Sequence, residues 1–372
     1  MLRKAISATR LTACALVLMC AAARAGSASA GETGASPASD VRYAQEAGLG
    51  IQVLQRAYVP ATGLYAAPSG WWNSANALTV VANYSRVAHS RQYLPTIANT
   101  FKNASKADGT VNFLNDYDDD EGWWALAWID AYDLTHKRAY LKMAETIFAN
   151  IASEWEPQAC GGGVWWKKPN EYKNAIANEL FLSVAASLAN RTRGAESASY
   201  LLWAHKEWEW FKASGMINGQ NLVNDGLDST NPQACTNNGR TAWSYNQGVI
   251  VGGLMELYRA DHDPGLLAQA VAIANAAIGS LTVDGVLTES TISGNDTPQF
   301  KGIFVRNLAA LYRFKPDAAY KNFIEANANA VWTNDQGSGH AFGARWNGPF
   351  DSFDATRQTS ALDVLVSAAE IQ

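Results

Sequence analysis

Residues 115–124 read Asn-Asp-Tyr-Asp-Asp-Asp-Glu-Gly-Trp-Trp and run directly into an apolar, helix-like segment, residues 125–134. Four consecutive carboxylates followed by two tryptophans suit neither a surface nor a core, because like charges repel each other and exposed indoles forgo burial. The pattern predicts that a ligand binds at the start of this helix.

The chain around this stretch reads as a succession of helices, with apolar residues spaced three and four apart. The expected helices cover residues 38–57, 73–89, 91–106, 120–135, 137–153, 172–190, 194–213, 244–260, 264–281, 300–313, 315–331 and 355–370. No strictly alternating stretch is long enough to compete with them. The sequence therefore predicts an all-α protein.

The connections between these helices alternate in length. Several helix pairs turn within a few residues, as after Leu134 and Asn190, whereas the connections 58–72, 107–119, 154–171, 214–243, 282–299 and 332–354 are long. Twelve helices connected in this way form six helical hairpins, which can close into an (α/α)6 barrel. All long connections then lie at one end of the barrel, and we expect the active site there.

The long connections and the helix starts after them carry eight of the fourteen tryptophans, interspersed with amides, acids and lysine. A sugar packs its C–H faces on aromatic rings and needs fixed donors and acceptors for its hydroxyls. The predicted substrate contacts are Trp72, Asn73, Asn76, Trp123, Trp124, Trp166, Asp225, Tyr245, Asn246, Gln247 and Lys301. For each single tryptophan a place in the barrel core remains an alternative, as does an Asp-Gly turn for Asp225 and a helix surface for Asn76 and Lys301.

Three other interpretations of the acidic run fit less well. A calcium loop would need glycine in place of Glu121 and glutamate in place of Ala127. An aspartate-rich diphosphate motif would need a carboxylate where Gly122 and Trp123 stand. Helix capping explains one or two acids but not four with a tryptophan pair attached.

A pair of glycosidase carboxylates fits the run better. Mutual repulsion raises the pKa of one carboxyl, while the helix N-terminus keeps the other ionised. The pair then offers a protonated acid for the leaving oxygen and a carboxylate for the anomeric carbon. The distance between the carboxyl groups decides between retention and inversion, and the sequence leaves it open.

The first 30 residues have the layout of a secretory signal peptide. Basic residues precede a short apolar run, residues 11–23, and small-x-small cleavage sites end at Ala25 and Ala30. We expect cleavage after Ala30, with Ala25 as the alternative, which leaves residues 31–372 as a single catalytic domain in a secreted or periplasmic protein. The apolar run is too short for a membrane span.

Cleavage after residue 30 removes four basic and no acidic residues, so the formal charge moves from −5 to −9. An acidic chain without a basic patch is a poor partner for nucleic acid or anionic lipid. The five histidines are scattered without metal-ligand spacing. We expect a monomer that takes a polysaccharide substrate and uses no metal and no cofactor.

Two cysteines, Cys160 and Cys235, remain after cleavage, in a compartment that permits disulfides. One bridge and two separate thiols in neighbouring loops are both compatible with the spacing.

Five segments of the chain together resemble glycoside hydrolase family 76, the bacterial and fungal endo-α-1,6-mannanases and their cell-wall relatives. These segments are residues 119–124, 160–166, 172–178, 243–248 and 300–304. Each is a weak motif alone, but the five in order, with compatible spacing, are quite specific. The resemblance spans residues 70 to 305 and implies an (α/α)6 barrel.

The resemblance further implies a retaining endo-hydrolase of α-1,6-linked mannan, with Asp119 as nucleophile and Asp120 as acid/base. Two alternatives remain: a transglycosylase acting on α-mannan or mannose-containing cell-wall glycans, and a non-catalytic mannan-binding protein. Residues 369–372 carry no hydrophobic tail, which favours a secreted hydrolase over an anchored transglycosylase.

Overall fold

A computed structural model describes residues 37–228 and 235–372, so the expected signal peptide, residues 1–30, lies outside the described residues. Ser36–Gln372 forms one compact unit. Its α-helices are α1 (Pro37–Arg56), α2 (Trp71–Val87), α3 (Leu94–Asn103), α4 (Asp118–Thr135), α5 (Arg138–Ser153), α6 (Ala175–Arg191), α7 (Gly194–Ala213), α8 (Ser244–Asp261), α9 (Pro264–Ser280), α10 (Thr297–Phe314), α11 (Ala318–Asn334) and α12 (Ala355–Glu370). Shorter elements are the 3-10 helices η1 (Ala104–Gly109) and η2 (Ser338–His340) and the strands β1 (Tyr58–Val59), β2 (Leu64–Tyr65), β3 (Thr282–Val283) and β4 (Val286–Leu287).

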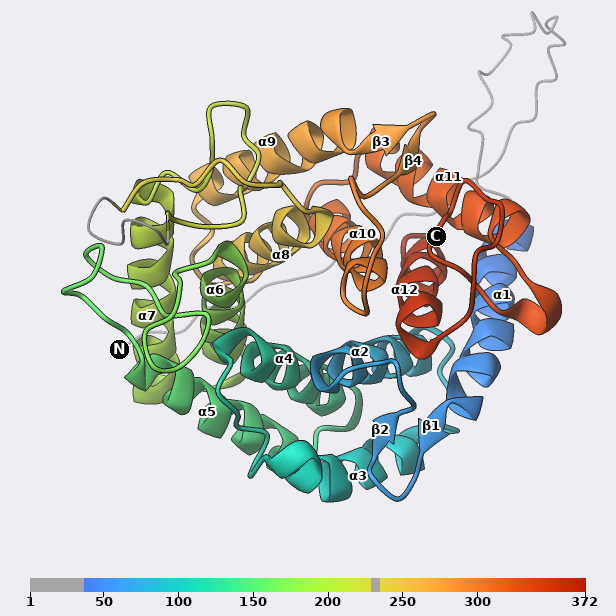
Figure 1. Cartoon of the computed structure of the whole chain (residues 1–372), viewed down its shortest axis with the longest axis horizontal. Coiled ribbons are helices and arrows are strands. Elements are labelled where there is room, and N and C mark those ends of the chain that lie inside the picture. The colour runs from blue at the N-terminus through green and yellow to red at the C-terminus, as the bar shows by residue number, and fades with distance from the viewer. Residues whose placement is uncertain (1–36, 229–234) are drawn as a thin grey trace, which may run out of the picture. The chain divides into compact units, whose positions relative to one another are not determined.

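The even-numbered helices form a closed inner ring. Each packs against the next, from α2 through α4, α6, α8 and α10 to α12, and α12 packs back against α2. The odd-numbered helices lie outside this ring (Figure 1). This arrangement confirms the predicted (α/α)6 barrel.

Burial differs between the two rings in the way their sequences predict. Inner helix α6 has 15 of its 17 residues buried, because it is covered by α4, α8 and α7, and a helix that is apolar nearly all round belongs in a core. Outer helix α5 instead buries one stripe, from Tyr140 through Ala144 and Ile147 to Ile151. None of the described helices is long and apolar enough to span a membrane.

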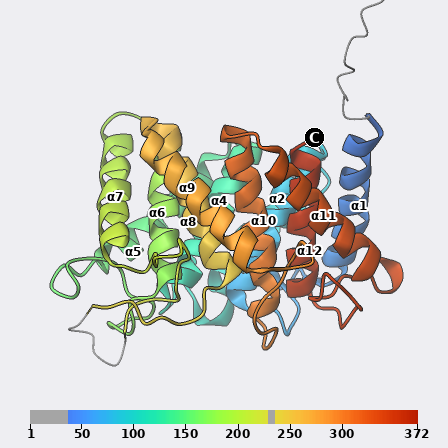
Figure 2. The ribbon, with the colours of Figure 1, turned by 90° about the horizontal axis from the view of Figure 1, so that it is seen from above.

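Every inner helix starts after a long connection, so the long connections gather at one end of the barrel (Figure 2). Two of them contain the antiparallel hairpins β1–β2 and β3–β4. The N-termini of all six inner helices, with their unpaired N–H groups, therefore converge on this end. The prediction that the long loops share one end is confirmed.

The opposite end holds the C-termini of the inner helices and carries a network of arginines. Four inner helices have an arginine in the last turn: Arg86, Arg191, Arg259 and Arg313. Arg191 pairs with Asp133 and Glu256, and Arg86 and Arg313 both pair with Glu370. Cations at helix C-termini complement the helix dipoles. These ion pairs therefore stabilise the C-terminal end of the inner ring.

Candidate active site

Helix α4 begins at Asp118, so its first turn carries all four consecutive acids. Successive helical residues point about 100° apart, which separates the run into two pairs. Asp118 and Glu121 are fully buried, whereas Asp119 and Asp120 are partly exposed. The acidic run therefore supplies one buried pair and one partly exposed pair of carboxyl groups.

The buried pair is neutralised by a lysine from the connection between α5 and α6. Lys168 Nζ lies 2.6 Å from Glu121 Oε1 and 3.1 Å from Asp118 Oδ1. Burial raises the pKa of Asp118 to about 7, although the Lys168 ammonium opposes the shift. Glu121 also accepts hydrogen bonds from the Asn150 side chain and the Asn115 backbone. These two acids thus support the start of α4 from behind.

Asp119 has a donor on each carboxylate oxygen. Its Oδ1 accepts from the backbone N–H of Asp120 at 3.0 Å, and its Oδ2 accepts from Trp166 Nε1 at 3.1 Å. Burial and the neighbouring Asp120 carboxylate raise the pKa of Asp119 well above its ordinary value, and both donors oppose that rise.

Asp120 accepts from the side chain of Asn115, whose Nδ2 lies 2.8 Å from Asp120 Oδ2. Burial raises the pKa of Asp120 to about 7; the Asn115 hydrogen bond lowers it, and the charges of Asp296 and Glu121 raise it further. Two adjacent carboxyls with raised pKa values bind protons as a pair. The pair therefore carries a proton at neutral pH that an ordinary aspartate would have lost.

A cleft opens beside Asp119 at the long-loop end. Its lining consists of Trp72, Asp119, Trp123, Trp166, Tyr172, Asn174, Asp225, Arg240, Tyr245, Asp296 and Phe300. Aromatic pairs form its walls: Trp72 and Trp123 stack at 5.7 Å, and Tyr245 and Phe300 at 3.9 Å between ring centroids. Such walls, interrupted by a few polar groups, suit the alternating apolar and polar faces of a sugar.

Two carboxylates in the cleft wall are fixed by aromatic donors. Asp225 Oδ2 accepts from the Tyr172 hydroxyl at 2.7 Å, and Asp296 Oδ1 accepts from Trp72 Nε1 at 2.9 Å. Each aspartate keeps further acceptor capacity for a substrate hydroxyl. Their contacts come from distant parts of the chain, which the barrel brings together.

The cleft gathers five of the predicted contact residues with Asp119: Trp72, Trp123, Trp166, Asp225 and Tyr245. It also contains five that were not predicted: Tyr172, Asn174, Arg240, Asp296 and Phe300. Tyr172, Asn174 and Phe300 stand within segments that carry the family resemblance, and that position was the available signal. Asp296 and Arg240 had no signal beyond their place on long connections.

Two further predicted contacts, Trp124 and Lys301, are absent from this lining and have buried side chains. Trp124 is fully buried and stacks on Trp128 at 5.8 Å. Lys301 is 2% exposed, donates to the carbonyl of Ala344 and lies over the Trp346 ring. Trp124 therefore has the place in the core that was its alternative, whereas the helix-surface alternative for Lys301 is wrong, because its side chain is buried.

The four predicted amide contacts are also buried, and three of them make hydrogen bonds within the protein. Asn73 accepts from the Gly70 N–H at the start of α2, and Asn76 accepts from Arg306. Gln247 both donates to and accepts from the backbone of Val223, which fixes the connection between α7 and α8. Asn246 is fully buried. None of the four is among the residues that line this cleft, and their contact with substrate stays a prediction.

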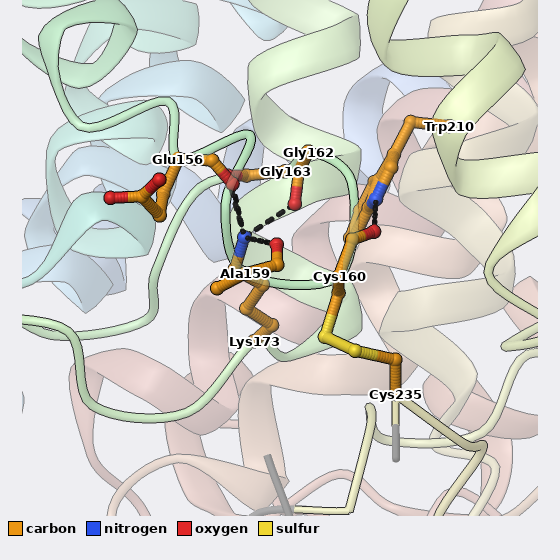
Figure 3. The surroundings of a disulfide bond; sticks show 8 residues. All are labelled: Glu156, Ala159, Cys160, Gly162, Gly163, Lys173, Trp210 and Cys235. Atoms are coloured by element: carbon orange, nitrogen blue, oxygen red, sulfur yellow. Dashed lines mark hydrogen bonds between the residues drawn. A yellow bond between two sulfur atoms is a disulfide. The ribbon is translucent and has the colours of Figure 1, made fainter. Parts of the chain in front are cut away.

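Cys160 and Cys235 form a disulfide (Figure 3). It joins the connection that carries Trp166 to the connection that carries Asp225. Of the two alternatives that the spacing allowed, the structure has the bridge.

A buried lysine organises the chain beside the disulfide (Figure 3). Lys173 Nζ donates to the carbonyls of Glu156, Ala159, Gly162 and Gly163 and lies over the rings of Trp165 and Trp210. Gly163 has φ +83°, and a Cβ there would lie 2.4 Å from Trp210, so the turn requires glycine. The connection between α5 and α6, which carries Trp166, is therefore held in place by the buried Lys173 side chain.

No cluster of three or more histidine, cysteine, aspartate or glutamate side chains suited to a metal ion occurs within residues 37–228 and 235–372.

Comparison with known proteins assigns the family. Residues 53–372 match the model of glycosyl hydrolase family 76. The chain belongs to this family. As a family 76 member it is a glycoside hydrolase, and its fold, cleft and adjacent aspartates agree with the resemblance found in the sequence.

Two relatives, one of them also solved as a variant with a bound oligosaccharide, show what the chain is similar to. DFG5 of Candida albicans, a mannan endo-1,6-α-mannosidase, is 25% identical over 342 residues, covering 83% of this chain and 74% of that protein. The GH76A α-1,6-mannanase from Salegentibacter sp. HEL1_6 has a TM-score of 0.80 at 23% identity, covering 89% of this chain and 100% of that chain. An inactive variant of that mannanase, with two adjacent aspartates changed to asparagine, in complex with α-1,6-mannotriose, has a TM-score of 0.79 at 23% identity and the same coverage.

Proposed function

We propose that this glycoside hydrolase cleaves α-1,6-mannosidic linkages within mannan backbones, with retention of the anomeric configuration. The observation that carries the proposal is the pair Asp119 and Asp120 at the cleft end of α4, with different hydrogen-bond partners on the two carboxyls. The mannosidase and mannanase relatives support the choice of substrate. The inactive double-aspartate variant of the Salegentibacter enzyme supports the choice of residues.

Asp119 is the proposed nucleophile. It lies in the cleft lining at a helix N-terminus and accepts two N–H hydrogen bonds. The helix N-terminus and the two donors favour its ionised form, against burial and the Asp120 charge, which raise its pKa. One of its oxygens attacks the anomeric carbon, forming a glycosyl ester as the bond to the leaving oxygen breaks.

Asp120 is the proposed acid/base. The pKa values of both carboxyls are raised, that of Asp120 to about 7, so the pair shares a proton, which we assign to Asp120 in the reactive form. It gives that proton to the leaving oxygen in the first step. In the second step, the Asp120 carboxylate removes a proton from water, whose oxygen attacks the anomeric carbon and breaks the ester to Asp119.

The cleft residues supply the proposed substrate contacts. Trp72, Trp123, Trp166 and Tyr245 offer ring surfaces, and Asp225 offers acceptors for mannose hydroxyls. Asp296 joins them as a second carboxylate in the wall.

Secretion and domain extent are part of the proposal. Removal of residues 1–30 would leave residues 31–372 as one catalytic domain, acting as a monomer outside the cytoplasm. The Cys160–Cys235 disulfide supports an oxidising compartment.

The deciding experiment incubates the mature protein, Asp119→Asn and Asp120→Asn with unbranched α-1,6-mannan and follows products and their anomeric configuration by NMR. The parent should release short oligosaccharides that are first formed as the α-anomer, and both variants should lose that activity while remaining folded. Initial release of the β-anomer would reject retention. Binding without release of reducing ends would reject catalysis, and longer oligosaccharides at high substrate concentration would identify a transglycosylase.

A further inference from the structure

Asn115 precedes α4 by three residues and contacts the proposed acid/base with its side chain. Asn115 Nδ2 donates to Asp120 Oδ2 at 2.8 Å, while Oδ1 of the same amide accepts from the backbone N–H of Tyr117 at 2.8 Å. Turning the amide by 180° would set its NH2 against an N–H and its oxygen against a carboxylate. The amide therefore has one orientation, with its donor toward Asp120.

The backbone of Asn115 is held by the buried ion pair behind α4. Its N–H donates to Glu121 Oε1 at 3.0 Å, and its carbonyl accepts from Lys168 Nζ at 3.1 Å. Lys168 and Glu121 are themselves joined at 2.6 Å. The pair Lys168–Glu121 thus fixes the backbone from which the Asn115 side chain reaches Asp120.

We propose that Asn115 is a positioning residue for Asp120: it occupies Oδ2 with a hydrogen-bond donor, so that the proton exchanged with substrate and water is carried by Oδ1. This inference rests on the proposed glycosidase function. An oxygen that accepts from a fixed N–H is a poor place for a second proton, and within the described residues Oδ1 has no protein donor assigned to it.

The two carboxyl oxygens of Asp120 keep separate roles in both steps of the proposed hydrolysis. Oδ1 gives its proton to the glycosidic oxygen as that C–O bond breaks and the ester to Asp119 forms. Asp120 is then a carboxylate, and the Asn115 hydrogen bond becomes charge-assisted and stronger. In the second step Oδ1 takes a proton from the attacking water, and Asn115 remains in place throughout.

The other groups around Asp120 act in the opposite direction from Asn115. Glu121 and Asp119 on α4 and Asp296 at the start of α10 are carboxylates, and together with burial they favour protonated Asp120. Asn115 is the side-chain donor that favours the ionised form. Removal of its amide should therefore raise the pKa of Asp120.

The first test is the pH dependence of kcat/KM on α-1,6-mannan for Asn115→Ala. The alkaline limb, where the acid loses its proton, should move upward by about one to two pH units, the usual effect of a hydrogen bond to a charged group. The acid limb, set by ionisation of Asp119, should move much less. An aryl α-1,6-mannobioside with a leaving group that needs no protonation should form the glycosyl ester at nearly the parent rate.

Asn150→Ala is the matched control. Asn150 donates to Glu121 Oε2 at 2.7 Å and so belongs to the same support, without contacting Asp120. It should lower the melting temperature and leave the alkaline limb in place. An unmoved alkaline limb in folded Asn115→Ala would overturn the proposal, and so would an equal shift in Asn150→Ala.

A readout without substrate separates this proposal from the proposed function. In protein labelled with 13C at the aspartate carboxyls, the Asp120 signal is assigned by its loss in Asp120→Asn and then titrated. Asn115→Ala should raise the apparent pKa of the pair. An inactive parent would reject the glycosidase function whatever the titration gives, whereas an active parent with an unchanged titration in Asn115→Ala would reject the role of Asn115 alone.

Discussion

The indole Nε1 of Trp166 donates a hydrogen bond to Oδ2 of Asp119 at 3.1 Å, across 47 residues of sequence. Trp166 stands on the connection that Lys173 and the disulfide fix, and Asp119 stands in the first turn of α4. The ionisation of the proposed nucleophile is thereby linked to the conformation of a loop.

Replacement of Trp166 by phenylalanine should keep an aromatic ring at this position and remove the N–H donor. The pKa of Asp119 should rise, because one of the two hydrogen bonds to its ionised form is lost, and the acid limb of kcat/KM should move to higher pH. We expect kcat to fall roughly 10- to 100-fold, the usual effect of a hydrogen bond to a charged group, with a smaller change in KM. Steady-state kinetics between pH 4 and pH 9 check both effects.

Trp165→Phe is the control, since the Trp165 Nε1 has no hydrogen-bond partner among the described residues. This change removes an indole N–H of the same loop with no acceptor to lose. The acid limb should stay where the parent has it. Equal shifts in both variants would mean that the loop, and not the hydrogen bond, controls Asp119.

Lys173→Met should destabilise the protein, because the buried carbonyls around its ammonium lose their shared donor. We expect a loss of about 2–4 kcal/mol in the free energy of unfolding, measured by denaturant titration. The value of kcat/KM should fall as well, since the same chain segment presents Trp166 and Tyr172. Lys206→Met is the matched variant, because Lys206 is exposed and stacks on Trp155 and Trp203. Its loss should stay below about 1 kcal/mol, and equal losses would contradict the structural role of Lys173.

The Cys160→Ser, Cys235→Ser double variant should be less stable than the oxidised parent. The bridge spans a sequence separation of 75 residues, for which the chain-entropy model gives about 4 kcal/mol. KM should rise, because the bridge joins the two connections that carry Trp166 and Asp225. A reducing agent should bring the parent to the melting temperature of the double variant and leave the double variant unchanged. An unchanged KM would show that other contacts hold the cleft open.

The barrel could be predicted from sequence because its signals are local. Apolar spacing located each helix to within a few residues, and the alternation of short and long connections is enough to place all inner helix N-termini at one end. The acidic run was interpreted correctly as a helix start, but the burial of Asp118 and Glu121 involves Lys168, which lies 47 residues beyond Glu121 and leaves no local signal.

The site residues were harder to predict, because polar side chains on an inner helix face either the cleft or a neighbouring element. Gln247 resembled a sugar ligand, yet its partner is the backbone of Val223, 24 residues away. Asp296 was missed, since its place beside Trp72 arises from closure of the ring over 224 residues. Both outcomes depend on tertiary contacts that leave no local pattern.

Asp120→Asn should change how stability depends on pH. The pKa of Asp120 is raised to about 7 in the folded protein, against about 3.9 in an unfolded chain. A raised pKa means that the folded state holds the proton more tightly, so this contribution to stability is full below about pH 4 and is lost as pH rises to about 7. Asparagine resembles protonated aspartate in shape and charge. The variant should therefore match the parent near pH 4 and melt higher than the parent at pH 8, by roughly 2 °C or more.

Asp317→Asn provides the opposite case. Asp317 is partly exposed at the start of α11, and its hydrogen bond from the Ala319 N–H lowers its pKa. A lowered pKa adds stability at pH values above the pKa of the unfolded chain, so this variant should gain no stability at pH 8.

Other buried acids also make the stability of the protein fall as pH rises, because burial raises the pKa values of Asp118, Asp335 and Glu289 to about 7. Part of this fall in stability should therefore persist in Asp120→Asn. Parallel melting curves for the parent and Asp120→Asn across this pH range would mean that the Asp119–Asp120 pair does not hold its proton at neutral pH, and the acid/base assignment would lose its physical basis.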